Sequence, residues 1–471
     1  MEPSTTEIVV IGGGPGGYAA AFYAADLGKK VTLIEMDRLG GVCLNRGCIP
    51  SKALLHATKM IAEARDSEKR GISFGEPKID LEKLRTWKNG ILTQLTGGIG
   101  QLAKARGVEV IEGKAYLDDS QTVRVETNGG QKYLRFEHAI LAGGSVAALP
   151  RAFDLGNPRI MTSTEALEIP DIPPRLLVIG GGYIGMELGT VYAMLGSEVH
   201  VVEALDTLLA GSDPDLARPV IAAARKKFKT IRFKAKVSSM ATAGKQIKVG
   251  VEHEGKVVEE LYDRVLVAVG RKPSEVDLGL DNTRVTRDDR GFVKVNESLQ
   301  TEDPAIHAIG DLVGGAMLAH KAAKEARLAV NAIVGDTSPH REFVVPAVVF
   351  TEPELAWCGL TEAEAKVKGM EVEVAKFPWG ASGRALTFDR PDGLTKLVIE
   401  PGTERILGVG LVGHGAGELI GEGVVAVEMG ATVSDLAECV HPHPTLSETL
   451  MEAAESYFGH ATHTYQRRRA E

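Results

Sequence analysis

The sequence predicts an α/β fold, and three observations lead to this prediction. A segment at 8–35, IVVIGGGPGGYAAAFYAADLGKKVTLIE, reads like a second segment at 176–203, LLVIGGGYIGMELGTVYAMLGSEVHVVE. Each joins a short apolar run, a glycine loop, an Ala/Leu-rich helical pattern and a second apolar run that ends in glutamate, which is the pattern of a βαβ unit. After Pro346, strand-like and helical patterns alternate. We therefore expect two Rossmann-like nucleotide-binding domains and a C-terminal α+β domain.

Length and composition are those of a globular protein with several domains. The 471 residues correspond to roughly three domains. The net charge of −9 opposes general nucleic-acid binding, which needs a basic footprint. The basic run at 225–236 is interpreted as a solvated face. No stretch approaches the roughly 18 consecutive apolar residues that indicate a membrane span.

The N-terminal residues and the cysteine usage predict a cytoplasmic protein. Residues 1–7 are polar and acidic and run straight into a strand pattern, so they resemble neither a signal peptide nor a transit peptide. The four cysteines, Cys43, Cys48, Cys358 and Cys439, are too few for a secreted disulfide scaffold. The close spacing of the first two favours catalysis over a structural crosslink.

The segments between and after the repeats complete the predicted architecture. Residues 80–105 read as a helix, residues 107–140 as a β-meander ending in AILAGGS, and residues 229–269 as strands ending in RVLVAVGR. No low-complexity linker separates these parts, so we expect the domains to pack tightly. We place the domain limits at 1–149, 150–271, 272–345 and 346–471.

The glycine loops of both repeats carry the GxGxxG signature of dinucleotide binding. The first glycine permits a tight turn, the second lets a pyrophosphate approach the backbone, and the third lets helix and strand pack closely. The helix N-terminus then offers N–H groups and a partial positive charge to the phosphates. Because each loop follows a strand and opens a helix, a glycine-rich turn without a ligand is the less favoured interpretation. The glycines are Gly12, Gly14 and Gly17 in the first loop and Gly180, Gly182 and Gly185 in the second.

An acidic residue closes each repeat and bears on the choice of cofactor. Glu35 and Glu203 can each accept hydrogen bonds from a ribose. A carboxylate at Glu203 would repel the additional phosphate of NADP, and no arginine follows it closely in VVEALDTLL. NAD is therefore favoured for the second repeat.

Cys43 and Cys48 lie in GGVCLNRGCIPSKALLH, residues 40–56. Their spacing fits neither a CxxC redox motif nor a zinc site, and we predict no metal. A bond across so short a loop would stabilise the fold little by the chain-entropy argument, which favours a redox role. Lys52 and the helix N-terminus can lower the pKa of a thiol there. Two unrelated buried thiols remain the alternative interpretation.

At these residues the chain resembles the pyridine nucleotide–disulfide oxidoreductases. GGVCLNRGCIPSKALLH is similar to their redox-disulfide motif, IHAIGDLVGGAMLAHKAAKEA at 306–326 to their second flavin-binding segment, and HPHPTLSE at 441–448 to their C-terminal active-site motif. The extended cysteine motif, LAHKA, RTWKNGILTQLTGGI and TKLVIEPGTERILGVGLVG favour the branch that acts on dihydrolipoamide. The resemblance covers essentially the whole chain.

This resemblance implies a function for each part of the chain. Residues 1–149 would bind FAD, residues 150–271 would bind NAD, residues 272–345 would form a central domain that completes the FAD site, and residues 346–471 would form the interface of a homodimer. The implied reaction oxidises protein-bound dihydrolipoamide and reduces NAD⁺. The implied partner is a lipoyl-bearing protein of a 2-oxoacid dehydrogenase, glycine cleavage or other lipoate-dependent system.

The resemblance also implies residue roles. A Cys43–Cys48 redox disulfide would exchange electrons with the flavin, with Cys48 on the flavin side, and His443 with Glu448 would serve as the base. On its own motif, His443 reads more readily as a structural histidine in a proline-rich turn, and His441 is the weaker candidate for the base. In relatives the His–Glu pair comes from the other subunit. FAD would contact Gly12, Gly14, Gly17, Glu35, Lys52 (paired with Glu187), Asp311, Met317, Ala319 and His320, and NAD would contact Gly180, Gly182, Gly185, Glu203 and Gly270.

Two positions depart from the family pattern. Val146-Ala147-Ala148 follows Ser145 where relatives usually carry a proline, which bears on the connection between the FAD and NAD parts. Arg46, between the cysteines, replaces a residue that is often smaller or acidic, and it can affect the pKa of a thiol or the choice of partner.

Alternative functions differ from the favoured one in specific residues. A glutathione reductase shares the cysteine pair but would prefer NADPH, usually through arginines that are absent after Glu203. Mercuric reductase and high-mass thioredoxin reductase would need C-terminal cysteines beyond Cys439, and soluble transhydrogenase lacks the redox pair. A flavin-loaded scaffold subunit without turnover is a further alternative, which the cysteine pair and His443 oppose.

Overall fold

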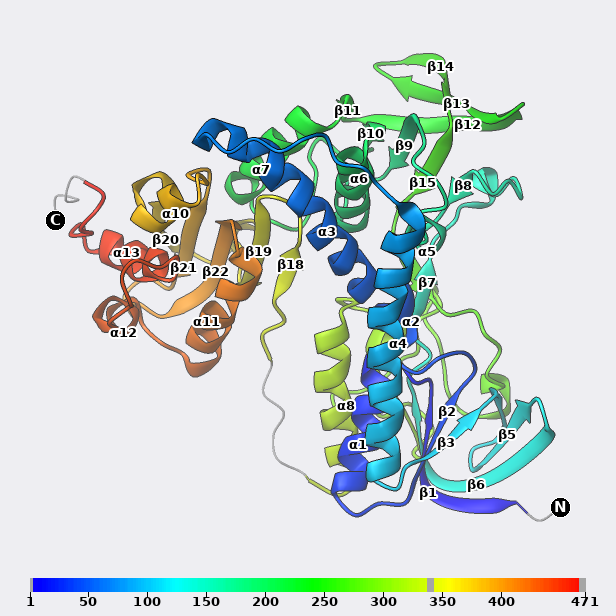
Figure 1. The fold of residues 1–471 in the computed structure, drawn as a ribbon. Coiled ribbons are helices and arrows are strands. Elements are labelled where there is room, and N and C mark those ends of the chain that lie inside the picture. Colours follow the sequence, from blue (N-terminus) through cyan, green and yellow to red (C-terminus); the bar gives the residue numbers. More distant parts are fainter. Residues whose placement is uncertain (1–2, 337–342, 466–471) are drawn as a thin grey trace.

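A computed structural model describes residues 3–336 and 343–465. In Figure 1, the first sheet with its helices lies in the lower half of the view, and the second βαβ unit lies above it. The C-terminal part stands at the left. The long helix α3 (Cys48–Asp66) runs through the middle and contacts α6 (Tyr183–Leu195). None of the helices in the described residues is long and apolar enough to cross a lipid bilayer.

The first repeat forms a βαβ unit in the order that the sequence predicts. Strand β1 (Ser4–Ile11) pairs in parallel with β2 (Val31–Glu35), and α1 (Pro15–Asp26) connects them. The side chains of Ile8, Val9 and Val10 are completely buried, because helices and strands cover both faces of the sheet. Helix α4 (Leu81–Ala105) agrees with the predicted helix at 80–105.

The sheet around β1 is completed by strands from distant parts of the sequence. Its order is β3-β2-β1-β6-β5-β4, with β17 paired to β6 (Gly130–Leu141). Strands β3 (Glu109–Glu112), β4 (Lys114–Asp119) and β5 (Thr122–Thr127) belong to the predicted meander. In contrast, β17 (Ile306–Ala308) returns from beyond the second repeat and lies parallel to β6, and α8 (Ala319–Ile333) then packs against α1.

The second repeat forms its own parallel sheet, in the order β11-β10-β9-β15-β8. Helix α6 connects β9 (Arg175–Ile179) to β10 (Glu198–Val202), as α1 connects β1 to β2. A three-stranded antiparallel sheet of β12, β13 and β14 projects from it (Figure 1). The remaining bounds are β8 Ile160–Met161, α7 Pro214–Lys227, β11 Thr230–Arg232, β12 Ala235–Ala243, β13 Gln246–His253, β14 Lys256–Tyr262 and β15 Arg264–Val267.

The C-terminal part is an antiparallel sheet with helices, which confirms the predicted α+β class. Its strand order is β18-β19-β22-β21-β20, and α11 (Ala416–Met429) and α13 (Glu448–Tyr457) contact its strands. The indole of Trp379 is buried in its core and donates a hydrogen bond to Thr395 Oγ1 (2.9 Å). The strands are β18 Ala347–Val349, β19 Glu354–Gly359, β20 Glu373–Pro378, β21 Leu394–Ile399 and β22 Ile406–Gly413.

A buried lysine joins the C-terminal sheet to the second nucleotide-binding unit. Lys396 on β21 forms ion pairs with Asp213 (2.7 Å) and Asp215 (3.0 Å) near the start of α7, and also with Glu362 of α9 (Glu362–Lys368). Its side chain is 1% exposed. Asp213 also accepts hydrogen bonds from the backbone N–H groups of Glu362 and Ala363 (both 3.2 Å). The ammonium group therefore occupies the space between the three carboxylates.

We predict that Lys396→Met destabilises the protein by about 3 kcal/mol, because it leaves the buried carboxylate of Asp213 without its cation. Thermal denaturation measures the loss as a lower melting temperature. Lys376→Met is the matched control: Lys376 pairs with the same Asp215 (2.7 Å) but is 40% exposed. Its loss should cost less than about 1 kcal/mol. Equal effects of the two substitutions would contradict the assigned role of Lys396.

Candidate active site

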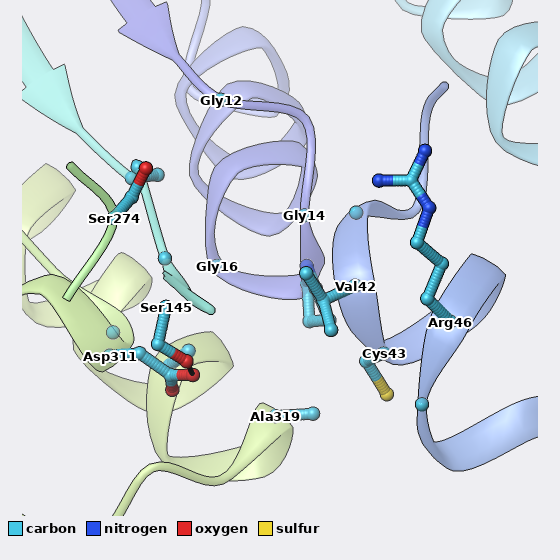
Figure 2. A pocket seen from close by; sticks show the side chains of 18 of the residues that line it. Gly12, Gly14, Gly16, Val42, Cys43, Arg46, Ser145, Ser274, Asp311 and Ala319 are labelled. Atoms are coloured by element: carbon cyan, nitrogen blue, oxygen red, sulfur yellow. Dashed lines mark hydrogen bonds between the residues drawn. The ribbon is translucent and has the colours of Figure 1, made fainter. Parts of the chain in front are cut away.

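One cavity collects most of the residues that the sequence nominated. It lies between the first glycine loop, the cysteine-bearing helices and the segment around Asp311 (Figure 2). The nominated residues on its wall are Gly12, Gly14, Glu35, Cys43, Cys48, Lys52, Glu187, Asp311, Met317 and Ala319. The nominated residues that do not line it are Gly17, Gly180, Gly182, Gly185, Glu203, Gly270, His320, His443 and Glu448.

The first glycine loop has the geometry that a pyrophosphate requires. Gly12 has a φ of 106°, and a Cβ there would lie 2.4 Å from the carbonyl oxygen of Ala142. A Cβ at Gly17 would lie 1.7 Å from the carbonyl oxygen of Gly12. At Gly14, which caps the start of α1, the nearest atom to an added Cβ would be Cα of Gly41, 3.8 Å away. The backbone therefore remains approachable at that position. The first and third glycines are therefore needed for packing, and the second leaves the helix N-terminus accessible to an anion.

The glutamate at the end of each repeat is held in the same way. Oε2 of Glu35 accepts a hydrogen bond from the N–H of Gly13 (2.6 Å), and its Oε1 accepts one from the N–H of Asp37 (2.8 Å). In the second repeat, Glu203 accepts from the N–H groups of Gly181 (2.6 Å) and Leu205 (2.7 Å). Each carboxylate is therefore fixed beside its glycine loop, where a ribose would be recognised.

The two cysteines are free thiols that face the same cavity from successive helices. Cys43 lies in α2 (Gly41–Arg46) and Cys48 opens α3, with Gly47 between the helices. A hydrogen bond with Cys48 and burial raise the pKa of the Cys43 thiol above its ordinary range. The same hydrogen bond lowers the pKa of Cys48, and although burial opposes this, the charge of Lys52 lowers the pKa further. Cys48 is therefore the sulfur that carries a thiolate more readily.

Lys52 connects the cysteine helix to the second repeat and to the C-terminal part of the chain. Its Nζ lies 2.9 Å from Oε2 of Glu187, a buried residue of α6. The other oxygen of Glu187 accepts a hydrogen bond from the N–H of Phe350 (3.0 Å), and the Lys52 ammonium lies 4.3 Å from the centre of the Phe350 ring. The positive charge is thus held one helical turn beyond Cys48.

The connection after Ser145, where the family's proline is absent, has a regular conformation. Strand β7 (Ser145–Ala147) pairs antiparallel with β16 (Arg271–Pro273). The Ser145 hydroxyl donates a hydrogen bond to Asp311, and Arg271 donates to both the hydroxyl and the carbonyl oxygen of Ser145 (2.8 Å each). Val146 and Ala147 therefore take a strand conformation, and the linked side chains orient Asp311 at the cavity wall (Figure 2).

His443 is paired with Glu448 but lies away from the cysteines. Its Nδ1 is 2.9 Å from Oε1 of Glu448, and the other carboxylate oxygen accepts a hydrogen bond from the N–H of Thr445 (2.7 Å). Although burial raises the pKa of Glu448, the hydrogen bonds from Thr445 and His443 lower it overall. The His443 side chain is 69% exposed, whereas that of His441 is 7% exposed and forms an ion pair with Glu422 (2.7 Å). In Figure 1, α13 lies with the C-terminal part at the left, whereas α2 lies beside α4 near the middle of the view.

Sequence reasoning missed several residues of the cavity wall. Gly113 and Lys114, which follow β3, line it together with Ser163, Ser274 and Arg287. These residues lie mostly in loops and strand ends, where neither hydrophobic periodicity nor a motif marks them. The sequence predicted only that Gly113 and Lys114 lie within the β-meander at 107–140, which does not mark them as cavity residues.

Comparison with known proteins gives matches over nearly the whole chain. Residues 6–326 match the family described as "Pyridine nucleotide-disulphide oxidoreductase", and residues 345–454 match the dimerisation domain of the same family. The dihydrolipoyl dehydrogenase of Haemophilus influenzae is 44% identical, over 97% of this chain and 96% of that protein. The dihydrolipoyl dehydrogenase of Haloferax volcanii is also 44% identical, over 98% of each chain.

Solved structures with the same fold are similar over a comparable length. The structure of LpdA from Mycobacterium tuberculosis has a TM-score of 0.88 and 28% identity, covering 96% of this chain and 99% of that one. The flavoprotein disulfide reductase RclA from Escherichia coli, solved as a Cu(II) complex, has a TM-score of 0.86 and 27% identity, covering 97% and 100%.

We predict that Lys52→Met raises the pKa of the Cys48 thiol, because it removes the positive charge that lowers this pKa. The pH profile of iodoacetamide alkylation at Cys48, followed by mass spectrometry of the reduced protein, should shift to higher pH. Lys59→Met is the matched control, because Lys59 lies on the same helix but pairs with Glu352 (2.8 Å). An unchanged profile in Lys52→Met would contradict the electrostatic role given to Lys52.

Proposed function

The chain belongs to the pyridine nucleotide-disulphide oxidoreductase family, and on that basis we propose that it oxidises protein-bound dihydrolipoamide with reduction of NAD⁺. One observation carries this proposal: Cys43 and Cys48 lie with Lys52 on the wall of the same cavity as the first glycine loop. Relatives that are 41–44% identical over nearly the full length carry the name dihydrolipoyl dehydrogenase.

The residues of the cavity fit FAD, and those of the second repeat fit NAD. Gly12, Gly14 and Gly17 would cradle the FAD pyrophosphate at the start of α1, Glu35 would bind the adenosine ribose, and Asp311 would lie on the flavin side. Met317, Ala319 and His320 belong to the segment that completes this site. Gly180, Gly182, Gly185, Glu203 and Gly270 would hold NAD. When bound, FAD would supply the two-electron redox chemistry that connects the reduced cysteines to NAD⁺.

The chemistry assigned to the chain itself is thiol–disulfide exchange. His443 of a second subunit, oriented by Glu448, accepts a proton from one substrate thiol. The resulting thiolate attacks Cys43 of the oxidised pair, the Cys43–Cys48 bond breaks, and Cys48 leaves as a thiolate beside Lys52. The second substrate thiol then displaces Cys43, which leaves as a thiol by taking up the proton of that second thiol, and the dithiolane ring closes. The substrate has lost two electrons, and the two cysteines hold them.

We propose a separate role for each part of the chain. Residues 1–149 and 272–345 would together bind FAD, residues 150–271 would bind NAD, and residues 346–471 would form the subunit interface. The match to a dimerisation domain supports a homodimer. A lipoyl-bearing protein as partner belongs to the proposal, and a cytoplasmic location, inferred from the few cysteines, stays a prediction.

We predict that the purified flavoprotein oxidises NADH with lipoamide but shows no turnover with NADPH and glutathione disulfide. The carboxylate of Glu203 repels the additional phosphate of NADPH, and no arginine follows Glu203 closely to bind it. Absorbance of the reduced nicotinamide measures both reactions side by side. Turnover only with NADPH and glutathione disulfide would make the protein a glutathione reductase, and bound FAD without turnover of either pair would make it a scaffold subunit.

We predict that Cys48→Ser lowers lipoamide turnover on the order of 1,000-fold while the protein retains FAD, because the exchange loses its leaving thiolate. Cys439→Ser, which changes an exposed cysteine outside the cavity, is the control and should keep its activity. Normal turnover in Cys48→Ser would disprove the proposed reaction path.

A further inference from the structure

Arg46 lies between the redox cysteines, and its partner lies in the loop that follows the first repeat. Its guanidinium group forms an ion pair with the carboxylate of Asp37. Both residues line the cavity assigned to FAD, which is the function on which this inference rests. In Figure 2, Arg46 extends from the helix that carries Val42 and Cys43, with its guanidinium group directed away from the Cys43 sulfur.

The backbone at Asp37 is fixed by hydrogen bonds to the first repeat. Its N–H donates to Glu35, whose carboxylate is in turn bound by the N–H of Gly13. The loop returns to the glycine loop once more at Gly40, whose N–H donates to the carbonyl oxygen of Gly13 (2.8 Å). The position of Asp37 therefore follows from the glycine loop and the ribose-binding glutamate.

Helix α2 is tied to this loop at two places. The side-chain amide of Asn45 donates to the carbonyl oxygen of Leu39 in the loop (3.1 Å) and to that of Gly41, the first residue of α2 (3.0 Å). Arg46 adds the ion pair with Asp37, a link between two side chains at the cavity wall. The residues between the two cysteines therefore connect the cysteine helix to the part of the cavity that would hold the adenosine half of FAD.

We propose that the Arg46–Asp37 ion pair is a clamp that retains FAD. The pair joins the loop that follows the first repeat to the end of α2, and both of its side chains line the part of the cavity wall beside which the ADP half of the cofactor would lie. Opening the ion pair would leave only the Asn45–Leu39 hydrogen bond, among the described residues, as a polar side-chain link between the loop at 36–40 and α2, and it would open the path by which FAD leaves.

The Arg46–Asp37 ion pair is exposed to solvent, so its loss should change FAD release rather than the stability of the fold. The side chains are 49% and 42% exposed, and ion pairs in such positions contribute little to the stability of the fold. The effect is therefore expected in the rate of FAD release from the folded protein, whereas the melting temperature of the apoprotein should stay unchanged.

The test compares FAD release from the holoenzyme with Arg46→Val, Asp37→Asn and the double variant. Protein is diluted for timed intervals, separated from free flavin by gel filtration, and the retained FAD is measured by absorbance. Each single variant should release FAD roughly two to five times faster, the range expected for an exposed charge pair, and the double variant should be no faster than either. Lys29→Val is the matched control, because it removes a similarly exposed ion pair with Glu7 (2.9 Å) outside the cavity and should leave release unchanged.

Three results would overturn the clamp: unchanged release in Arg46→Val, independent effects that multiply in the double variant, or slower release in Asp37→Asn. The last result would mean that Asp37 acts only by repulsion. Variants that lose FAD entirely are compared by the rate at which apoprotein rebinds added FAD, where a clamp predicts the same non-multiplying pattern. A parent protein that cannot be loaded with FAD at all would disprove the proposed function, so the two failures are distinguishable.

Discussion

The ion pair between Lys52 and Glu187 is the interaction on which the arrangement of the site depends. It joins the cysteine helix to the helix of the second repeat, and through the N–H of Phe350 it also reaches the C-terminal part. A buried carboxylate is costly unless it is paired and hydrogen-bonded, and each oxygen of Glu187 has such a partner. The same contact that fixes three parts of the chain also sets the electrostatic environment of Cys48. Structure and reactivity are therefore coupled at one residue pair.

The sequence predicts those parts of the fold that local patterns determine. Both βαβ repeats are present, and the helix expected at 80–105 begins and ends within one residue of that range, because apolar periodicity and glycine position fix such elements locally. The pairing of Lys396 with Asp213 could not be predicted, because it joins residues 183 positions apart in the chain. The same holds for the contribution of Gly113 and Lys114 to the cavity wall.

In the candidate site, too, the sequence predicts contacts between residues that are close in the chain but not contacts that depend on the fold. Cys43, Cys48 and Lys52 are close together because they lie on consecutive turns of two short-range elements. Arg46, whose role the sequence left open, gains a partner only once the loop at 36–41 is folded. His443 is close to Glu448 within HPHPTLSE, yet this chain places both far from the cysteines. A site that combines the cysteines with this histidine, as we propose, would need a second copy of the chain, and the match to a dimerisation domain supports that proposal.

The return of β17 to the first sheet has a consequence for how the protein is made on the ribosome. The N-terminal sheet receives its last strand only after the intervening second nucleotide-binding unit has been synthesised, because β17 begins at Ile306. Until then, one edge of β6 exposes unpaired backbone groups. The second unit is continuous in sequence and can fold while the first still waits for its final strand. Nascent chains that end before residue 306 would therefore carry an open sheet edge, and they are the species that a chaperone would need to protect.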